Sequence, residues 1–208
     1  MPGLYHGSAQ GGLTELKAFS SLHGRGDRVL YLTDCVPYAL FYIWDGARLG
    51  SGRKHVTGSV RQGRAWYEEQ FPGQLEAFYG GTSGWLYRVE PASGAEPLAG
   101  REALFYAQGD QPVAGAAFIP DVYRALLDWE ARGMLEVSRF EDRTLAEQEE
   151  LTGRIAQMIA QNSFYQGKPE ADFYRRFFRE AWALAERGGG IGWEQGNAIG
   201  TSPERALL

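Results

Sequence analysis

Up to about residue 140, apolar residues occur in short runs that are separated by turn-forming segments. Runs of roughly four to eight apolar, aromatic and β-branched residues between such segments are typical of strands. The expected strands cover 28–33, 84–90, 102–107, 112–118 and 135–140. The turn-rich segments between them favour antiparallel pairing.

The C-terminal part of the chain has a helical spacing of apolar residues instead, and two helices are expected before it. Pro37 and Pro120 each precede an apolar run, and proline is favoured in the first turn of a helix. Thr144 and Glu147 have the spacing of a capping box, which predicts a helix start. The expected helices cover 37–44, 120–132, 144–159 and 169–187. The last one carries an aromatic stripe that we interpret as core packing, formed by Phe173, Phe177, Phe178 and Trp182.

Two segments before the C-terminal helices lack a strong pattern. Residues 46–64 are rich in glycine and arginine without a period, which predicts a loop, and its arginines are candidates for phosphate contact. Residues 65–79 are weakly helical. These patterns predict an α+β fold with an α+β domain over 1–142, a helical appendage over 143–190 that packs on it, and an irregular tail over 191–208.

Composition excludes several classes of protein. Hydrophobic residues make up 44% and charged residues 23% of the 208 residues, which argues against disorder, collagen-like repeats and rods. The single cysteine, Cys35, excludes an intrachain disulfide and a cysteine-rich zinc cluster, and no metal site is expected. The net charge of −5 argues against a broad phosphate-binding face. No long apolar window or export signal is seen, so we expect a cytoplasmic protein without a membrane partner.

The N-terminal region carries the candidate chemistry. His6, Gly7 and Ser8 place an imidazole and a hydroxyl around a glycine, where the backbone is open to close approach by a ligand. Tyr31 follows in the strand Tyr31-Leu32-Thr33, and Tyr42 lies eleven residues further on, in the expected helix.

In this order, the elements resemble the opening of the ADP-ribosyltransferase fold, in its diphtheria-toxin-like and poly(ADP-ribose) polymerase-like branch. The resemblance covers about 45 residues, and it implies a split, mostly antiparallel sheet with NAD as substrate. It also implies that His6 binds the adenosine ribose and that the backbone of Gly7 binds the nicotinamide carboxamide, with Ser8 as part of the same motif. Tyr31 and Tyr42 would then cover the two faces of the nicotinamide ring.

The sequence departs from the family pattern at two positions. Ala39 stands where a small hydroxyl residue often contacts the carboxamide. The catalytic glutamate of the family usually opens a later strand, and the matching position here is Gln111, with Asp110 beside it. A carboxylate there stabilises the oxocarbenium-like state formed when the nicotinamide–ribose bond breaks, and glutamine carries no charge.

The sequence is compatible with three functions. The first is an NAD-dependent transferase that cleaves the nicotinamide–ribose bond and passes ADP-ribose to an unknown acceptor, which would be a protein, a nucleic acid or a small molecule. The second is a non-catalytic module that binds NAD or ADP-ribose, as the missing glutamate favours. The third is an RNA 2′-phosphotransferase-like enzyme, which the acidic charge balance disfavours.

Overall fold

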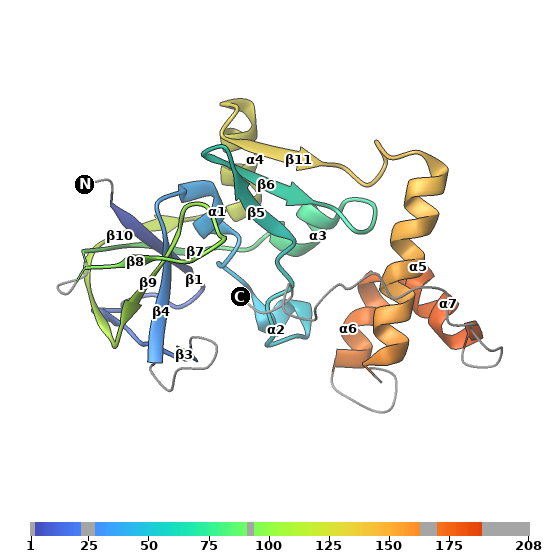
Figure 1. Ribbon diagram of the computed structural model, residues 1–208, viewed down its shortest axis with the longest axis horizontal. Helices are drawn as coiled ribbons and strands as arrows, with labels where there is room; N and C mark the ends of the chain where they lie inside the picture. Colours follow the sequence, from blue (N-terminus) through green and yellow to red (C-terminus); the bar gives the residue numbers. More distant parts are fainter. Residues whose placement is uncertain (1–2, 22–27, 91–93, 163–169, 189–208) are drawn as a thin grey trace. The chain divides into compact units, whose positions relative to one another are not determined.

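The computed structural model describes residues 3–21, 28–90, 94–162 and 170–188 (Figure 1). The chain has an α+β fold with a mostly antiparallel sheet, a second sheet and helices toward the C-terminus. The fold class expected from the sequence is therefore confirmed. The expected tail at 191–208 lies outside the described residues.

The chain forms two compact units, each assembled from separate stretches of sequence. The first, which we call the sheet unit, contains residues 1–45, 58–67 and 75–137. The second, which we call the helical unit, contains residues 46–57, 68–74 and 138–208. Parts of 46–74 thus belong with residues that follow them by more than sixty positions in the chain.

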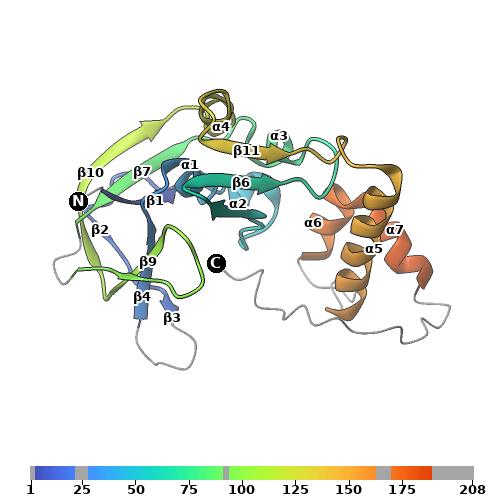
Figure 2. The same ribbon diagram turned by 45° about the horizontal axis from the view of Figure 1, so that its top comes forward.

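The large sheet of the sheet unit has the strand order β2-β10-β7-β1-β4-β9-β8, and β3 also pairs with β4. Its strands are β1 (Leu4–Ser8), β2 (Glu15–Leu16), β3 (Ser20–Ser21), β4 (Arg28–Thr33), β7 (Gly84–Val89), β8 (Glu96–Pro97), β9 (Leu104–Gln108) and β10 (Gln111–Ile119). In Figures 1 and 2, β4 and β9 lie on one side of β1, and β7 and β10 lie on the other. The strands expected near 28–33, 84–90, 102–107 and 112–118 are confirmed.

One core cluster of the sheet unit is built from alternate residues of these strands. Leu30 and Leu32 are buried on β4, and they pack with Tyr87 and Val89 of β7 and with Ala107 of β9. Because successive side chains of a strand point to opposite faces, this pattern directs residues 30 and 32 inward together. Tyr31 lies between them in sequence and is only half-buried.

The second sheet has the order β11-β6-β5, with β5 (Gly58–Arg61), β6 (Arg64–Glu68) and β11 (Leu135–Ser138). β5 and β6 form a hairpin whose tip residues, Gln62 and Gly63, have φ values of 52° and 74°. The loop expected over 46–64 is therefore wrong for its second half, and α2 (Gly46–Leu49) occupies its start. The two-residue turn requires positive φ at both positions. Gln-Gly is a weaker sequence signal for such a turn than Asn-Gly.

Three helices complete this part of the fold. α1 (Val36–Leu40) has Pro37 in its first turn, as expected, but it ends sooner than the predicted 37–44. α3 (Gln74–Tyr79) is all that is helical in 65–79, because β6 takes up the start of that segment. α4 (Val122–Ala131) confirms the predicted helix at 120–132, and the side chain of Asp121 accepts a hydrogen bond from the Arg124 N–H at its start.

The helical unit contains α5 (Leu145–Gln161), α6 (Glu170–Phe177) and α7 (Arg179–Gly188). The capping box at the start of α5 is confirmed, since the Thr144 side chain accepts a hydrogen bond from the Glu147 N–H and the Glu147 carboxylate accepts one from the Thr144 N–H. The single helix expected over 169–187 is divided at Phe178. Phe173, Phe178 and Trp182 are buried, as the stripe predicts. No helix in the described part of the chain is both long and apolar enough to cross a membrane.

Candidate functional site

The ladder between β1 and β4 ends at the residues that the sequence singles out. β1 pairs with β7 along its whole length, from Leu4 to Ser8. With β4, in contrast, it shares one residue pair, Tyr5 with Thr33. Beyond that pair the Nδ1 atom of His6 lies 3.2 Å from the backbone oxygen of Tyr31. We call this place, bounded by residues 6–8 and Tyr31, the β1–β4 opening.

The structure thus brings His6 and Tyr31 together, through the ring of one and the backbone of the other. Strand alternation directs the His6 side chain to the face of Leu4, which packs on the core, and the Tyr31 side chain to the face of Thr33. A ligand on one face of the sheet would meet only one of the two rings. A ligand would meet both rings only by lying between the two strands, where the His6 ring reaches the Tyr31 oxygen.

Gly7 is fixed by its close contact with α1. A Cβ atom at this position would lie 2.1 Å from the backbone oxygen of Ala39, so no larger residue fits without a shift of the helix. Backbone groups two residues apart in a strand point to the same side, and Tyr5 pairs with β4. The N–H and C=O of Gly7 therefore point toward β4, beyond the last ladder pair.

The next residue, Ser8, supports the turn that follows β1. Its Oγ accepts a hydrogen bond from the Gln10 N–H at 3.1 Å. The side chain is half-buried and lies across from Trp85 of β7. In this geometry Ser8 holds the chain at the edge of the opening.

Tyr42 follows the end of α1 and is held by a second tyrosine. Its hydroxyl lies 2.9 Å from that of Tyr38, and the two ring centroids are 5.5 Å apart. Burial raises the pKa of Tyr42 well above its ordinary value, and burial also raises the pKa of Tyr31. Both phenols are therefore neutral at physiological pH. Ala39, one turn earlier, is buried and brings no hydroxyl.

Gln111 and Asp110 lie at the start of β10, and both side chains are hydrogen-bonded to neighbouring protein groups. Gln111 is 4% exposed, and its Nε2 donates to the backbone oxygens of Gln108 at 2.7 Å and Gly109 at 3.3 Å. Through β7, Val113 is level with Leu4 of β1. Gln111 precedes that level by two residues on β10, while Gln108, which accepts from its amide, pairs with Val29 of β4.

The carboxylate of Asp110 is bound at both oxygens. It accepts a hydrogen bond from the Ala18 N–H at 2.8 Å and contacts the Lys17 ammonium at 2.7 Å. Lys17 is the main cause that lowers the pKa of Asp110, with the Ala18 N–H next. Asp110 is therefore ionised at neutral pH, and its side chain is still 39% exposed.

Residues 101–103 also belong to this region, although they are not among the site residues predicted from the sequence. The Thr33 hydroxyl donates to the backbone oxygen of Ala103 at 2.7 Å, directly beyond the Tyr5–Thr33 pair. Ala103 has a φ of 58°, a conformation that is uncommon for a residue other than glycine. The preceding carboxylate, Glu102, accepts hydrogen bonds from the N–H groups of Gln62 and Gly63 at the β5–β6 tip. No periodicity or motif in the sequence signals these contacts.

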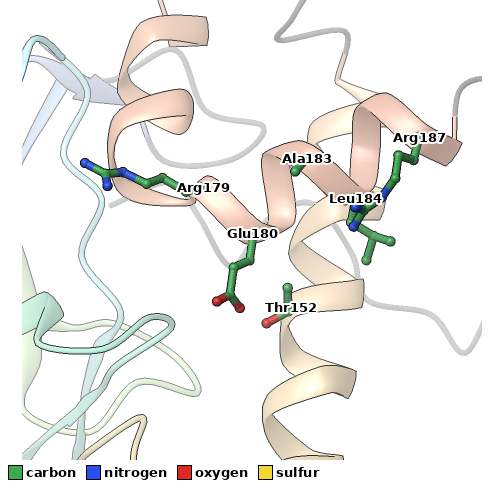
Figure 3. A pocket seen from close by; sticks show the side chains of 6 residues that line it. All are labelled: Thr152, Arg179, Glu180, Ala183, Leu184 and Arg187. Atoms are coloured by element: carbon green, nitrogen blue, oxygen red, sulfur yellow. The ribbon is translucent and has the colours of Figure 1, made fainter.

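A separate recess of about 430 Å³ lies in the helical unit, between α5 and α7. Figure 3 shows Glu180 and Thr152 pointing toward one another across it. The remaining lining residues are Arg179, Ala183, Leu184 and Arg187. None of the site residues predicted from the sequence lines this recess. Among the described residues, no group of three or more His, Cys, Asp or Glu side chains is placed to hold a metal ion.

Comparisons with known proteins found no match: no protein-family model fits the sequence, and neither a curated protein nor a solved structure matches the chain.

Proposed function

We propose that the chain binds NAD in the β1–β4 opening, in the manner of the ADP-ribosyltransferase fold that its N-terminal region resembles. The nicotinamide ring lies between Tyr31 and Tyr42, and the adenosine ribose lies toward His6. One observation carries the proposal: the ladder between β1 and β4 stops at Tyr5 and Thr33, and beyond that pair the ring of His6 reaches the backbone oxygen of Tyr31.

The groups at the opening suit the two ends of NAD. The backbone of Gly7 offers one donor and one acceptor toward β4, and a carboxamide carries the matching acceptor and donor. The nicotinamide ring is flat, and offset stacking on a tyrosine contributes about 0.5–1.5 kcal/mol beyond burial. A cation over a neutral phenol gains further from the ring quadrupole, and oxidised nicotinamide is cationic. These pairings favour NAD over an uncharged aliphatic ligand.

Substitution of Tyr31 tests the binding site. In Tyr31→Ala the stacking surface is lost, so we expect NAD affinity to fall about tenfold, whereas Tyr31→Phe keeps the ring and should bind NAD as the wild type does. Calorimetric titration of NAD into the wild type and both variants measures this difference. Equal affinity in Tyr31→Ala and the wild type would remove Tyr31 from the site. Absence of NAD binding to the wild type would refute the proposal as a whole.

Transfer of ADP-ribose is the second candidate function, and the ionised, partly exposed carboxylate of Asp110 favours it. In such a reaction nicotinamide leaves with the electron pair of the ribose C1′–N bond, and a nucleophile of the acceptor bonds to C1′ and loses its proton. A nearby carboxylate stabilises the positive charge that develops on the ribose. The inward orientation of Gln111 weakens this candidate, because its amide is taken up by Gln108 and Gly109.

Release of free nicotinamide separates the two functions. If Asp110 is the working carboxylate, Asp110→Asn should lower the release rate on the order of 10²–10³-fold, while Gln111→Glu has little effect. If position 111 is the functional one, Gln111→Glu should raise release. Lys17→Gln is the matched control, because it removes the same ion pair but keeps the carboxylate. No release from any variant, with NAD binding intact, would leave binding as the function.

A further inference from the structure

Residues 101–103 are fixed against the end of β4 by two sets of hydrogen bonds. The Thr33 hydroxyl bonds to the Ala103 oxygen, and Thr33 also pairs with Leu104 in the β4–β9 ladder. Glu102 bonds to the N–H groups at the β5–β6 tip, and the Arg101 N–H bonds to the Leu98 oxygen at 3.0 Å. The backbone that carries Arg101 is therefore held close to the end of the β1–β4 ladder.

Arg101 is half-buried, and its guanidinium lacks a countercharge in contact among the described residues. No carboxylate in that part of the chain lies within salt-bridge distance of it, whereas Arg88, Arg124, Arg143 and Arg175 each have such a partner. Partly burying an unpaired cation costs free energy, since it loses water without gaining a partner. A half-buried arginine without an acidic neighbour in contact therefore favours an anion that arrives with a ligand.

The charge of Arg101 also acts on the two tyrosines near the end of α1, Tyr38 and Tyr42. Burial raises the pKa values of Tyr38 and Tyr42, and the positive charge of Arg101 acts on both phenols in the opposite direction. The adjacent Glu102 does not neutralise it by contact, because both carboxylate oxygens of Glu102 accept hydrogen bonds from the backbone of the hairpin tip. The charge of Arg101 therefore acts on the ring that our proposed function assigns to nicotinamide.

We propose that Arg101 binds a phosphate group of the ligand in the β1–β4 opening, so that the site selects a nucleotide over free nicotinamide or its nucleoside. This inference rests on the proposed function and adds the residue that recognises the negative charge of the ligand. A guanidinium presents two parallel N–H donors that match two phosphate oxygens, and such charge-assisted pairs are among the stronger hydrogen bonds in proteins. The nicotinamide-proximal phosphate of NAD is the group that would lie within reach of a cation held at the end of β4.

A ligand series separates the phosphate contact from the ring contacts. Wild type, Arg101→Gln and Arg101→Lys are titrated with NAD, nicotinamide mononucleotide and nicotinamide riboside, of which the last carries no phosphate. We expect Arg101→Gln to lose about tenfold or more in affinity for the two phosphate-bearing ligands and to bind the riboside as the wild type does. Arg101→Lys should retain part of the affinity, because the charge remains but the paired donors are lost. Arg124→Gln, an exposed arginine on α4, is the matched control.

The outcomes distinguish this inference from the function on which it rests. If the wild type binds NAD and Arg101→Gln binds it equally well, the phosphate contact is wrong and the NAD site stands. If Arg101→Gln loses the riboside as strongly as NAD, the side chain supports the fold and does not read the phosphate, which also overturns the inference. If none of the three ligands binds to the wild type, the proposed function fails and this inference fails with it.

Discussion

Gly7 has two separate physical reasons to be glycine. The sequence indicates the first, which is the open approach that glycine gives a ligand to the backbone. The structure adds the second, since a Cβ atom there would lie 2.1 Å from the Ala39 oxygen and 3.1 Å from a carbon of the Ile43 side chain. The backbone oxygen of a packed helix cannot move aside as a flexible side chain does. Packing alone therefore accounts for the residue, with or without a ligand.

Replacing Gly7 with alanine tests the packing reason. The added methyl group forces α1 away from β1, and overpacking of this kind commonly costs about 1–3 kcal/mol. We expect Gly7→Ala to lower the free energy of unfolding by that amount, measured by urea denaturation. Gly115→Ala is the matched control in the same sheet, because its Cβ would have no contact closer than 3.6 Å. Equal free energies of unfolding for the two variants would mean that α1 shifts to accommodate the methyl group without loss of stability.

Individual site residues differ in how far the sequence could predict them. The resemblance assigns His6 and Tyr31 to one site, and the structure brings the His6 ring to the Tyr31 backbone oxygen, while the site itself stays a prediction. Arg101 could not be found in this way, because its place depends on the positive φ of Ala103 and on the contact of that residue with Thr33. Such a contact between residues 70 positions apart leaves no periodic signal in the sequence.

Among the elements, those with a strong pattern and clear boundaries were predictable. The strand at 28–33 is an uninterrupted apolar and β-branched run, and it forms over that range. The β5–β6 hairpin was not predicted. Val60, Ala65 and Tyr67 are buried and alternate with more exposed positions, but the arginines between them obscure this pattern in the sequence. Arginines near the strand ends make the segment resemble a loop in sequence, although their long side chains are compatible with an exposed strand end.

The last predicted helix shows the limit of periodicity alone. Residues 169–187 carry one continuous apolar stripe, which indicates one helix. The chain instead leaves helical geometry at Phe178, although the Phe178 N–H still bonds to the Tyr174 oxygen and the Trp182 N–H bonds to the Phe178 oxygen. The break permits Phe173 and Phe178 both to be buried within the helical unit. No glycine or proline marks the position, so tertiary packing decides it.

At the scale of the whole molecule, the helical unit takes up two segments from the first half of the chain. The ring of His55 stacks on that of Phe173, with centroids 4.0 Å apart and planes inclined by 15°, and it meets the ring of Tyr174 edge-on. Arg176 donates a hydrogen bond to the Arg48 oxygen at 3.0 Å. Phe71, from the second segment, packs edge-on against Phe178. The sequence does not indicate these contacts, because loop segments carry no periodic signal for their distant partners.

The burial of His55 makes the helical unit sensitive to acid. Burial, with a smaller effect of the Arg53 charge, lowers the pKa of His55 from 6.5 to about 4. Between these values an unfolded chain takes up a proton that the folded unit does not bind. Stability is therefore fully present above about pH 6.5 and declines as the pH falls toward 4. From pH 7 to pH 5 the loss amounts to about 2 kcal/mol.

Hydrogen exchange measures this loss segment by segment in the full chain. After correction for intrinsic exchange rates, the protection of amides in 46–57 and α6 should fall about thirtyfold between pH 7 and pH 5. The amides of β7 belong to the sheet unit, whose core lacks His55, and serve as the internal reference. In His55→Phe the stacking ring remains but cannot take up a proton, so the pH dependence of 46–57 should largely disappear. If protection in this variant falls as steeply as in the wild type, another group is responsible for the acid sensitivity. If β7 loses protection in parallel with 46–57 in the wild type, the two units unfold together, and His55 then governs the stability of the whole chain.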